Sequence, residues 1–176
     1  MRRVLSLRND QRTRPVNLRL LRRVARELLA DLLHLEQSDL TVSLLAAPEM
    51  TRVNETFVHH AGSTDVITFD YAENEVSSSG CPPATVQGEI LICVDEAVAQ
   101  ARQFRTTWPS ELVRYLTHGV LHLLGYDDLT AAQRRRMKRE EDRLVRELAR
   151  RFPLWQLDRS WAAASPAPRS RRPALP

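Results

Sequence analysis

The sequence predicts a single domain of α+β or α/β class, and three observations lead to this prediction. The chain has 176 residues, a usual length for one domain. Hydrophobic residues make up 43% of it, which is enough to form a core. Segments with helical spacing of apolar residues alternate with short β-branched runs, which indicates roughly four strands interleaved with helices.

The first half of the chain alternates between strands and helices. Residues 3–8 predict a short strand, and residues 16–37 predict an amphipathic helix because leucines recur there every three or four positions. The segment 40–46 predicts a second strand, and a proline predicts the start of a short helix over 48–58. The β-branched and aromatic run at 63–70 predicts a third strand.

The second half begins with a loop and ends with three helices. Residues 71–86 are acidic and then rich in Ser, Gly and Pro, which predicts a loop. The apolar run 88–94 predicts a strand buried on both faces. Helices are expected over 95–104, with Asp95 as its cap, over 109–124, and over 130–151, with Thr130 as its cap.

We expect the folded domain to span 1–155 and a basic Pro- and Ala-rich tail, 156–176, to be disordered. No run approaches the length of about 18 apolar residues that crosses a membrane, so no membrane association is expected. Cys81 and Cys93 have no metal or redox spacing, and Cys93 lies in an apolar run where a buried free thiol is expected. This favours a reducing, cytoplasmic location.

The most informative segment begins at His118 and ends at Asp128. His118 and His122 are four positions apart, so they share one face of a helix and can bind one metal ion. Gly125 can adopt the left-handed conformation that ends a helix, and the returning chain would bring Asp127 or Asp128 towards the two rings. Three such ligands and one open position are the catalytic arrangement of zinc.

Two alternatives bear on this motif. Histidines four apart also occur by chance on amphipathic helices. The spacing matches one zinc-protease pattern, but the protease motif has a glutamate base directly after its first histidine, and Gly119 stands there. The segment therefore favours a metal hydrolase that lacks the protease base.

Charge is distributed unevenly along the chain. The net charge is +8 over residues 1–26, −12 over 27–101 and +8 over 102–176. Basic ends suggest a polyanion partner such as RNA. The alternative is a set of solvated helix faces in a chain biased towards arginine, since only one basic residue, Lys138, is a lysine. The run 134–136 is itself interpreted as a solvated face rather than an RNA groove.

Three motifs in order resemble the YbeY-type endoribonucleases, the bacterial ribosomal RNA maturation factors. The stretch from His118 to Asp128 resembles their signature. Asn54 followed by the strand 63–69 resembles a second motif, and the strand 88–94 followed by a helix resembles a third. The resemblance covers roughly residues 40–150.

The resemblance implies a metal-dependent, single-strand-specific endoribonuclease that acts in ribosomal RNA maturation and ribosome quality control. It implies single-stranded and ribosomal RNA as substrate, the ribosome or its small subunit as partner, and a mixed four-stranded sheet surrounded by helices. We expect one Zn²⁺ per chain at the end of a central helix.

Two departures from the family pattern matter. Position 128 is usually a third histidine, so we expect the metal ligands to be His118, His122 and Asp128. A carboxylate reduces the charge at the ion and also suits other divalent metals. The family usually has an arginine in the segment where this chain has His59 and His60, which would then supply a cation or proton donor, unless they are surface histidines.

In the expected mechanism a metal-bound water or the ribose 2′-hydroxyl attacks the phosphodiester. The motif assigns no general base. Asp65, Glu89, His59 and His60 are candidates, and Asp65 and Glu89 could instead orient a ligand histidine. The alternative function is a ribosome-assembly or RNA-binding factor whose metal is structural and whose activity is weakened by both departures.

Overall fold

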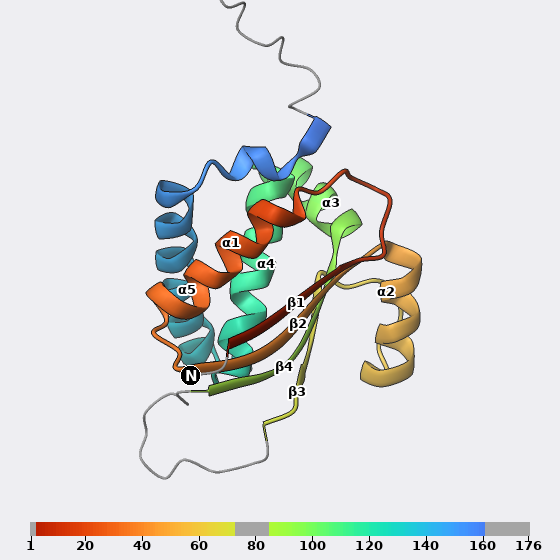
Figure 1. The fold of residues 1–176 in the computed structure, drawn as a ribbon. Coiled ribbons are helices and arrows are strands. Elements are labelled where there is room, and N and C mark those ends of the chain that lie inside the picture. Colours follow the sequence, from red (N-terminus) through yellow and green to blue (C-terminus); the bar gives the residue numbers. More distant parts are fainter. Residues whose placement is uncertain (1–2, 73–84, 161–176) are drawn as a thin grey trace, which may run out of the picture.

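The computed structural model describes residues 3–72 and 85–160, and its centre is one four-stranded sheet (Figure 1). The strand order is β1-β2-β4-β3. Parallel pairing joins β1 (Arg3–Asn9) to β2 (Gln37–Leu45) and β2 to β4 (Thr85–Cys93), whereas β3 (Val66–Asp70) lies antiparallel to β4 at one edge. The expected α+β domain with a mixed sheet is confirmed.

The helices cover the two faces of the sheet unequally, as Figure 1 shows. One face carries α1 (Leu18–Glu27), α4 (Trp108–Leu123) and, outside α4, α5 (Ala131–Arg151). Next to α4 lies α3 (Val94–Phe104), and of the helices in the described residues α2 (Ala47–Val53) lies on the opposite face. The helix α4 is central because it packs against β3, β4, α3 and α5.

Strand β4 separates the two parts of the core. Ile90 and Ile92 belong to the larger cluster beneath α4, whereas Leu91 and Cys93 join a smaller cluster with Met50 of α2. The prediction that this strand is buried on both faces is therefore confirmed. Cys93 is a fully buried free thiol, as expected, and burial raises its pKa. Each buried aliphatic side chain of this core contributes about 1.5–3 kcal/mol.

The first predicted helix is too long. After α1 the chain forms a π-helical segment, Leu28–Leu32, and His34 then adopts a left-handed conformation with φ 53°. Leu35 is buried in the turn that follows rather than on a helix. Leu35 continued the helical spacing of leucines in the sequence, but its side chain packs from the turn that leads into β2.

Three strands begin at other positions than expected, and the first of them, β2, begins at Gln37 rather than at residue 40. The third predicted strand, at 63–70, begins only at Val66, and β4 begins at Thr85 because its first residues pair with the extended start of β2. Asp95 does not cap α3, because its Oδ2 accepts the backbone N–H of Ala47 at 2.6 Å and thereby holds the start of α2.

The fold continues past residue 155, where the sequence analysis placed the domain boundary. Leu154–Leu157 form a 3₁₀ turn in which Leu157 is fully buried. Asp158 pairs with Val16 and accepts the indole N–H of Trp108 at 3.1 Å. The rest of the expected tail, 161–176, lies outside the described residues, as do Cys81 and most of the expected loop. No described helix combines the length and apolarity needed to cross a membrane.

Candidate metal centre

Local sequence signals fix both ends of α4. Thr107 caps its start by accepting the N–H of Ser110, and Pro109 occupies the first turn. At the other end Gly125 has φ +79°. Its N–H binds the carbonyl of His122 at 2.9 Å, and the N–H of Tyr126 binds the carbonyl of Leu121 at 3.0 Å. This pair of bonds is a Schellman cap, so the expected glycine-mediated reversal is present.

Gly119 lets α4 lie close to the sheet. A Cβ atom at this position would come within 2.8 Å of Cγ2 of Ile90. The position therefore faces β4 rather than the histidine side of the helix. This is a physical reason why a residue at position 119 supplies no base to the two histidines.

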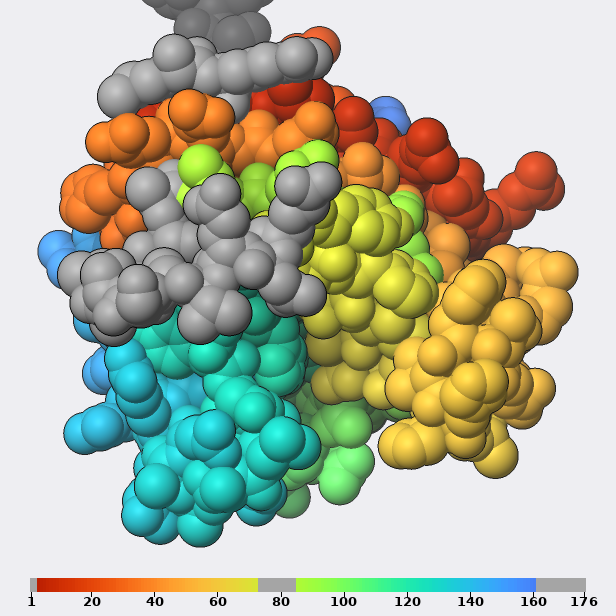
Figure 2. Space-filling model, turned by 90° about the horizontal axis from the view of Figure 1, so that it is seen from below, coloured from red at the N-terminus to blue at the C-terminus, as the bar shows by residue number. Residues whose placement is uncertain are grey.

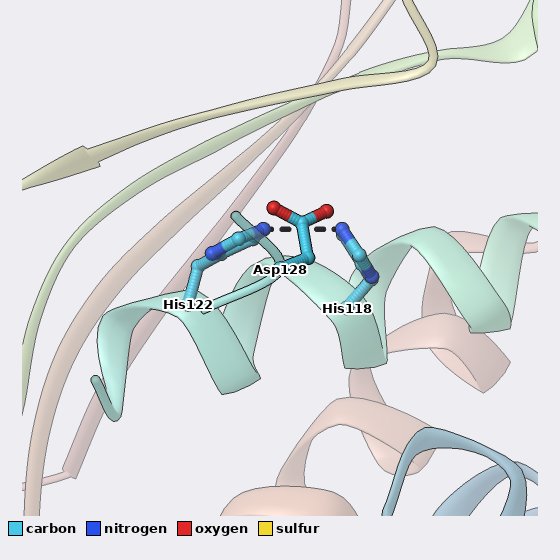
Figure 3. A group of neighbouring side chains, drawn as sticks. All are labelled: His118, His122 and Asp128. Atoms are coloured by element: carbon cyan, nitrogen blue, oxygen red, sulfur yellow. Dashed lines mark hydrogen bonds between the residues drawn. The ribbon is translucent and has the colours of Figure 1, made fainter. Parts of the chain in front are cut away.

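His118 and His122 meet through their Nε2 atoms, which are 3.1 Å apart (Figure 3). Their rings are nearly perpendicular, with an interplanar angle of 83°. Each ring is also held at its Nδ1 atom. Nδ1 of His118 lies 2.9 Å from Oε2 of Glu141 in α5, and Nδ1 of His122 lies 3.1 Å from the carbonyl oxygen of Tyr126.

These outer contacts determine where the ring protons sit. A carboxylate and a carbonyl oxygen can only accept, so both Nδ1 atoms carry the proton. In the neutral rings both Nε2 atoms then present lone pairs to each other. Burial, and then the neighbouring His118 ring, lower the pKa of His122, which favours its neutral form. Two lone pairs that face each other at this distance suit a shared cation.

The loop after α4 adds the carboxylate of Asp128. One ligand atom from each of His118, His122 and Asp128 lies within 4.8 Å of the other two, and all three residues are half-buried. Figure 3 shows the Asp128 side chain between the two rings. Asp127 has another task, because its Oδ1 accepts the N–H groups of Asp128 at 2.7 Å and Leu129 at 3.3 Å, which shapes the turn.

Glu141 was not identified from the sequence. Its carboxylate is buried and also accepts hydrogen bonds from Arg114 and, at 2.8 Å, from Nζ of Lys138. Burial opposes its ionisation, but hydrogen bonds from His118 and the two cations outweigh burial and lower the pKa of Glu141 to about 2. A signal existed in the sequence, because Glu141 takes an apolar position in the spacing of Met137, Leu144 and Leu148.

The donor set fits a divalent metal ion. Two imidazole nitrogens and one carboxylate oxygen are ligands that zinc accepts. Hydrogen bonds from the far ring nitrogens to a carboxylate and a backbone carbonyl are the usual support of such ligands. The group can therefore hold a metal ion, and its donors alone do not select one metal.

The other candidate residues lie apart from this group. Glu89 belongs to the sheet face that carries α2, where its carboxylate accepts the hydroxyl of Ser43 at 3.1 Å. Asp65 precedes β3 and accepts the N–H of Val66 at 2.9 Å. His59 and His60 are exposed and follow the π-helical segment Asn54–Val58, which continues α2.

The charge of Asp65 nevertheless acts on a residue of α4. Burial, and then the charge of Asp65, raise the pKa of Tyr115, which precedes His118 by three positions. Figure 2 shows a hollow between the end of α4 with its following loop (teal to cyan) and α2 (gold). The end of α4 that carries the two histidines thus stands at an open surface.

Comparison with known proteins agrees with this geometry. A family model described as endoribonuclease YbeY matches residues 6–149. Among curated relatives, the endoribonuclease YbeY of Salinibacter ruber is 31% identical over 80% of this chain and 89% of its own length. That of Micrococcus luteus is 35% identical over 72% and 80%, and that of Chlorobium phaeovibrioides is 40% identical over 56% and 61%.

A solved structure has the same fold. The solution structure of TM1509 from Thermotoga maritima superposes with a TM-score of 0.60 and covers 96% of this chain and 100% of that one. The two sequences are 24% identical, so this likeness concerns the fold alone.

Proposed function

Since the chain belongs to the endoribonuclease YbeY family, we propose that it is a metal-dependent endoribonuclease that cleaves single-stranded RNA. We further propose that it acts in the cytoplasm on ribosomal RNA, during maturation and quality control of the ribosome, at the small subunit. The observation that carries this proposal is the pair of Nε2 atoms that face each other beside the Asp128 carboxylate.

His118, His122 and Asp128 would hold one Zn²⁺ ion, with another divalent ion as a possible substitute. Bound there, the ion would supply Lewis-acid polarisation of a phosphoryl oxygen. Glu141 and the carbonyl of Tyr126 keep both rings in the tautomer that binds metal. The charge of Glu141 is offset by Arg114 and Lys138, so the contact between Glu141 and His118 adds little net negative charge to the metal centre.

We propose Asp65 as the group that accepts the proton of the attacking hydroxyl. Its charge acts on Tyr115, which precedes His118 by three positions in α4, whereas Glu89 is on the other face of the sheet. Asp65 is already bound to backbone N–H and hydroxyl donors, which keep its carboxylate oriented. An Asp65→Asn variant should keep its metal and lose most of its cleavage rate.

The test compares wild-type protein with His122→Ala. Each is loaded with Zn²⁺ and incubated with a 5′-labelled single-stranded RNA and with the same sequence as a duplex. We expect wild type to cut only the single strand, and His122→Ala to lose both cleavage and stoichiometric zinc. If wild type retains zinc, binds the RNA and leaves it intact, the proposal is wrong and the metal has a structural role.

A further inference from the structure

The first nine residues of α5 include basic side chains and no acidic ones. Residues 131–139 contain five cations and no acid. Four of them, Arg134, Arg135, Lys138 and Arg139, are exposed and line one surface hollow together with Ala131 and Ala132. We call these four side chains the basic face. Its members include like charges four positions apart, which destabilise a helix.

The second half of the same helix is different. Arg143 pairs with Glu140 at 2.6 Å, and Arg150 and Arg151 both pair with Glu147. This contrast argues against a merely solvated surface in an arginine-rich chain. From residue 140 onward the arginines of α5 alternate with acidic residues that pair with them, whereas over residues 131–139 they do not.

Two cations, Arg134 of the basic face and its neighbour Arg136, have structural partners. The guanidinium of Arg134 donates from Nε and Nη2 to the carbonyl oxygen of Asp128, at 3.2 and 3.1 Å. Arg136 stacks on Tyr126, whose carbonyl holds His122. These contacts join the start of α5 directly to the loop that carries the third ligand of the metal centre.

Arg135 and Arg139 are left without such partners. No acidic side chain of the described residues pairs with either guanidinium, whereas Lys138 is partly neutralised by Glu141 and Asp142. Two exposed arginines with uncompensated charge lie one turn apart on the helix whose Arg134 contacts the Asp128 loop, and they complement the charge of a nucleic-acid backbone.

We propose that the basic face binds the phosphodiester backbone of the RNA strand next to the phosphate that occupies the metal centre. This inference rests on the proposed function and adds to it a docking path along α5. Arg135 and Arg139 would each contact one backbone phosphate. Such contacts carry no base preference, so they would strengthen binding of any single-stranded sequence.

The test measures binding in metal-free protein, so that cleavage does not intervene. A 5′-fluorescein-labelled 12-nucleotide oligouridine is titrated with wild type and with R135Q/R139Q, and anisotropy is followed at roughly 50 to 200 mM salt. Glutamine keeps helix propensity, and both arginines are exposed. We expect the variant to bind about tenfold more weakly and to lose about 1.4 from the slope of log Kd against log salt, since each phosphate contact on a single strand contributes about 0.7.

Two variants serve as controls. R19Q/R26Q removes two exposed arginines from α1 and should bind like wild type. R135K/R139K keeps the two charges and should retain the wild-type slope, because a lysine still meets a phosphate as a point charge. Equal weakening in R135Q/R139Q and R19Q/R26Q would overturn the proposal in favour of general charge. An unchanged slope in R135Q/R139Q would also overturn it. The same titration is made with phosphatidylserine vesicles, and if R135Q/R139Q loses binding to the vesicles but not to the RNA, the proposal is likewise wrong.

Failure of this inference and failure of the proposed function are distinguishable. If zinc-loaded wild type cuts the RNA while R135Q/R139Q binds like wild type, only the basic face is wrong. If R135Q/R139Q loses binding as expected while zinc-loaded wild type leaves the RNA intact, the basic face remains and the nuclease assignment fails.

Discussion

Oε2 of Glu141 lies 2.9 Å from Nδ1 of His118, so a residue of α5 orients a candidate metal ligand of α4. The contact crosses the interface between two helices that follow each other in the chain. It links the orientation of the imidazole to the packing of α5. Glu141 also pairs with two cations at that interface, Arg114 and Lys138. The centre is therefore supported by a charge network around the buried Glu141 carboxylate.

Replacing Glu141 with glutamine should weaken metal binding. The amide keeps the size of the side chain but removes the negative charge that makes the His118 imidazole a stronger ligand for the metal. Zinc affinity should therefore fall by about 10- to 100-fold. Competition with a chromogenic chelator measures this loss. The matched control is Glu140→Gln, which removes the neighbouring carboxylate that faces Arg143 and should leave affinity unchanged. Equal affinities in both variants would contradict a role for Glu141 at the ligand.

Replacing Asp128 with asparagine should remove the third ligand. If Asp128 binds the ion, saturating zinc should raise the melting temperature of this variant far less than that of wild type. Ligand at 100 times its Kd stabilises a folded protein by about 2.7 kcal/mol. Asp127→Asn is the control, because its amide oxygen can still accept the two N–H groups of the turn while the same charge is lost. Scanning calorimetry with and without zinc separates the two, and an equal loss in both would point to charge alone.

Replacing Gly125 with alanine should strain the turn that delivers Asp128. No atom blocks a Cβ there, so the cost comes from the φ of +79° and amounts to about 1–2 kcal/mol of unfolding free energy. Gly62→Ala is a matched control with φ +86° and open space. Urea denaturation should show similar losses for both variants, while zinc affinity should fall only in Gly125→Ala. Unchanged zinc affinity there would show that the turn does not position the ligand.

The last turn of the described chain should respond to acid. Burial opposes ionisation of Asp158, but hydrogen bonds from Ser160 and Trp108 outweigh it and lower its pKa. A lowered carboxylate pKa stabilises the fold above the unfolded-state value near 3.8, and this contribution is lost as the pH falls through the folded-state value. Asp158→Asn should therefore cost about 1 kcal/mol at pH 7 and less below pH 3.8.

Urea denaturation of wild type and Asp158→Asn at pH 7 and below pH 3.8 measures the free energy of unfolding that the variant loses at each pH. A cost for Asp158→Asn that is the same at both pH values would contradict the assignment.

The sequence predicts the parts of this centre that depend on neighbouring residues. Histidines one turn apart, a glycine that ends the helix and an acid after it are set by local geometry, and the structure places the expected side chains together. Strand types followed from β-branched runs, although β4 starts earlier because its pairing with β2 overrides the weak local signal.

The sequence could not predict contacts that need tertiary packing. Glu141 reaches His118 only because α5 folds back on α4, and the second support is a backbone carbonyl, which has no residue-type signature. The side of the sheet that Glu89 faces depends on strand register. Leu35 kept the helical spacing of the first helix yet packs from a turn, so spacing alone overestimated that helix.

The residues around the candidate ion lie close together along the chain, since 23 positions separate His118 from Glu141. By contrast, the sheet needs partners far apart, such as β2 and β4. The histidine pair therefore stays within reach of a metal in the denatured ensemble, before the sheet is assembled. Because binding to unfolded chains offsets part of the stabilisation, the zinc-induced rise in melting temperature underestimates the affinity of the native protein.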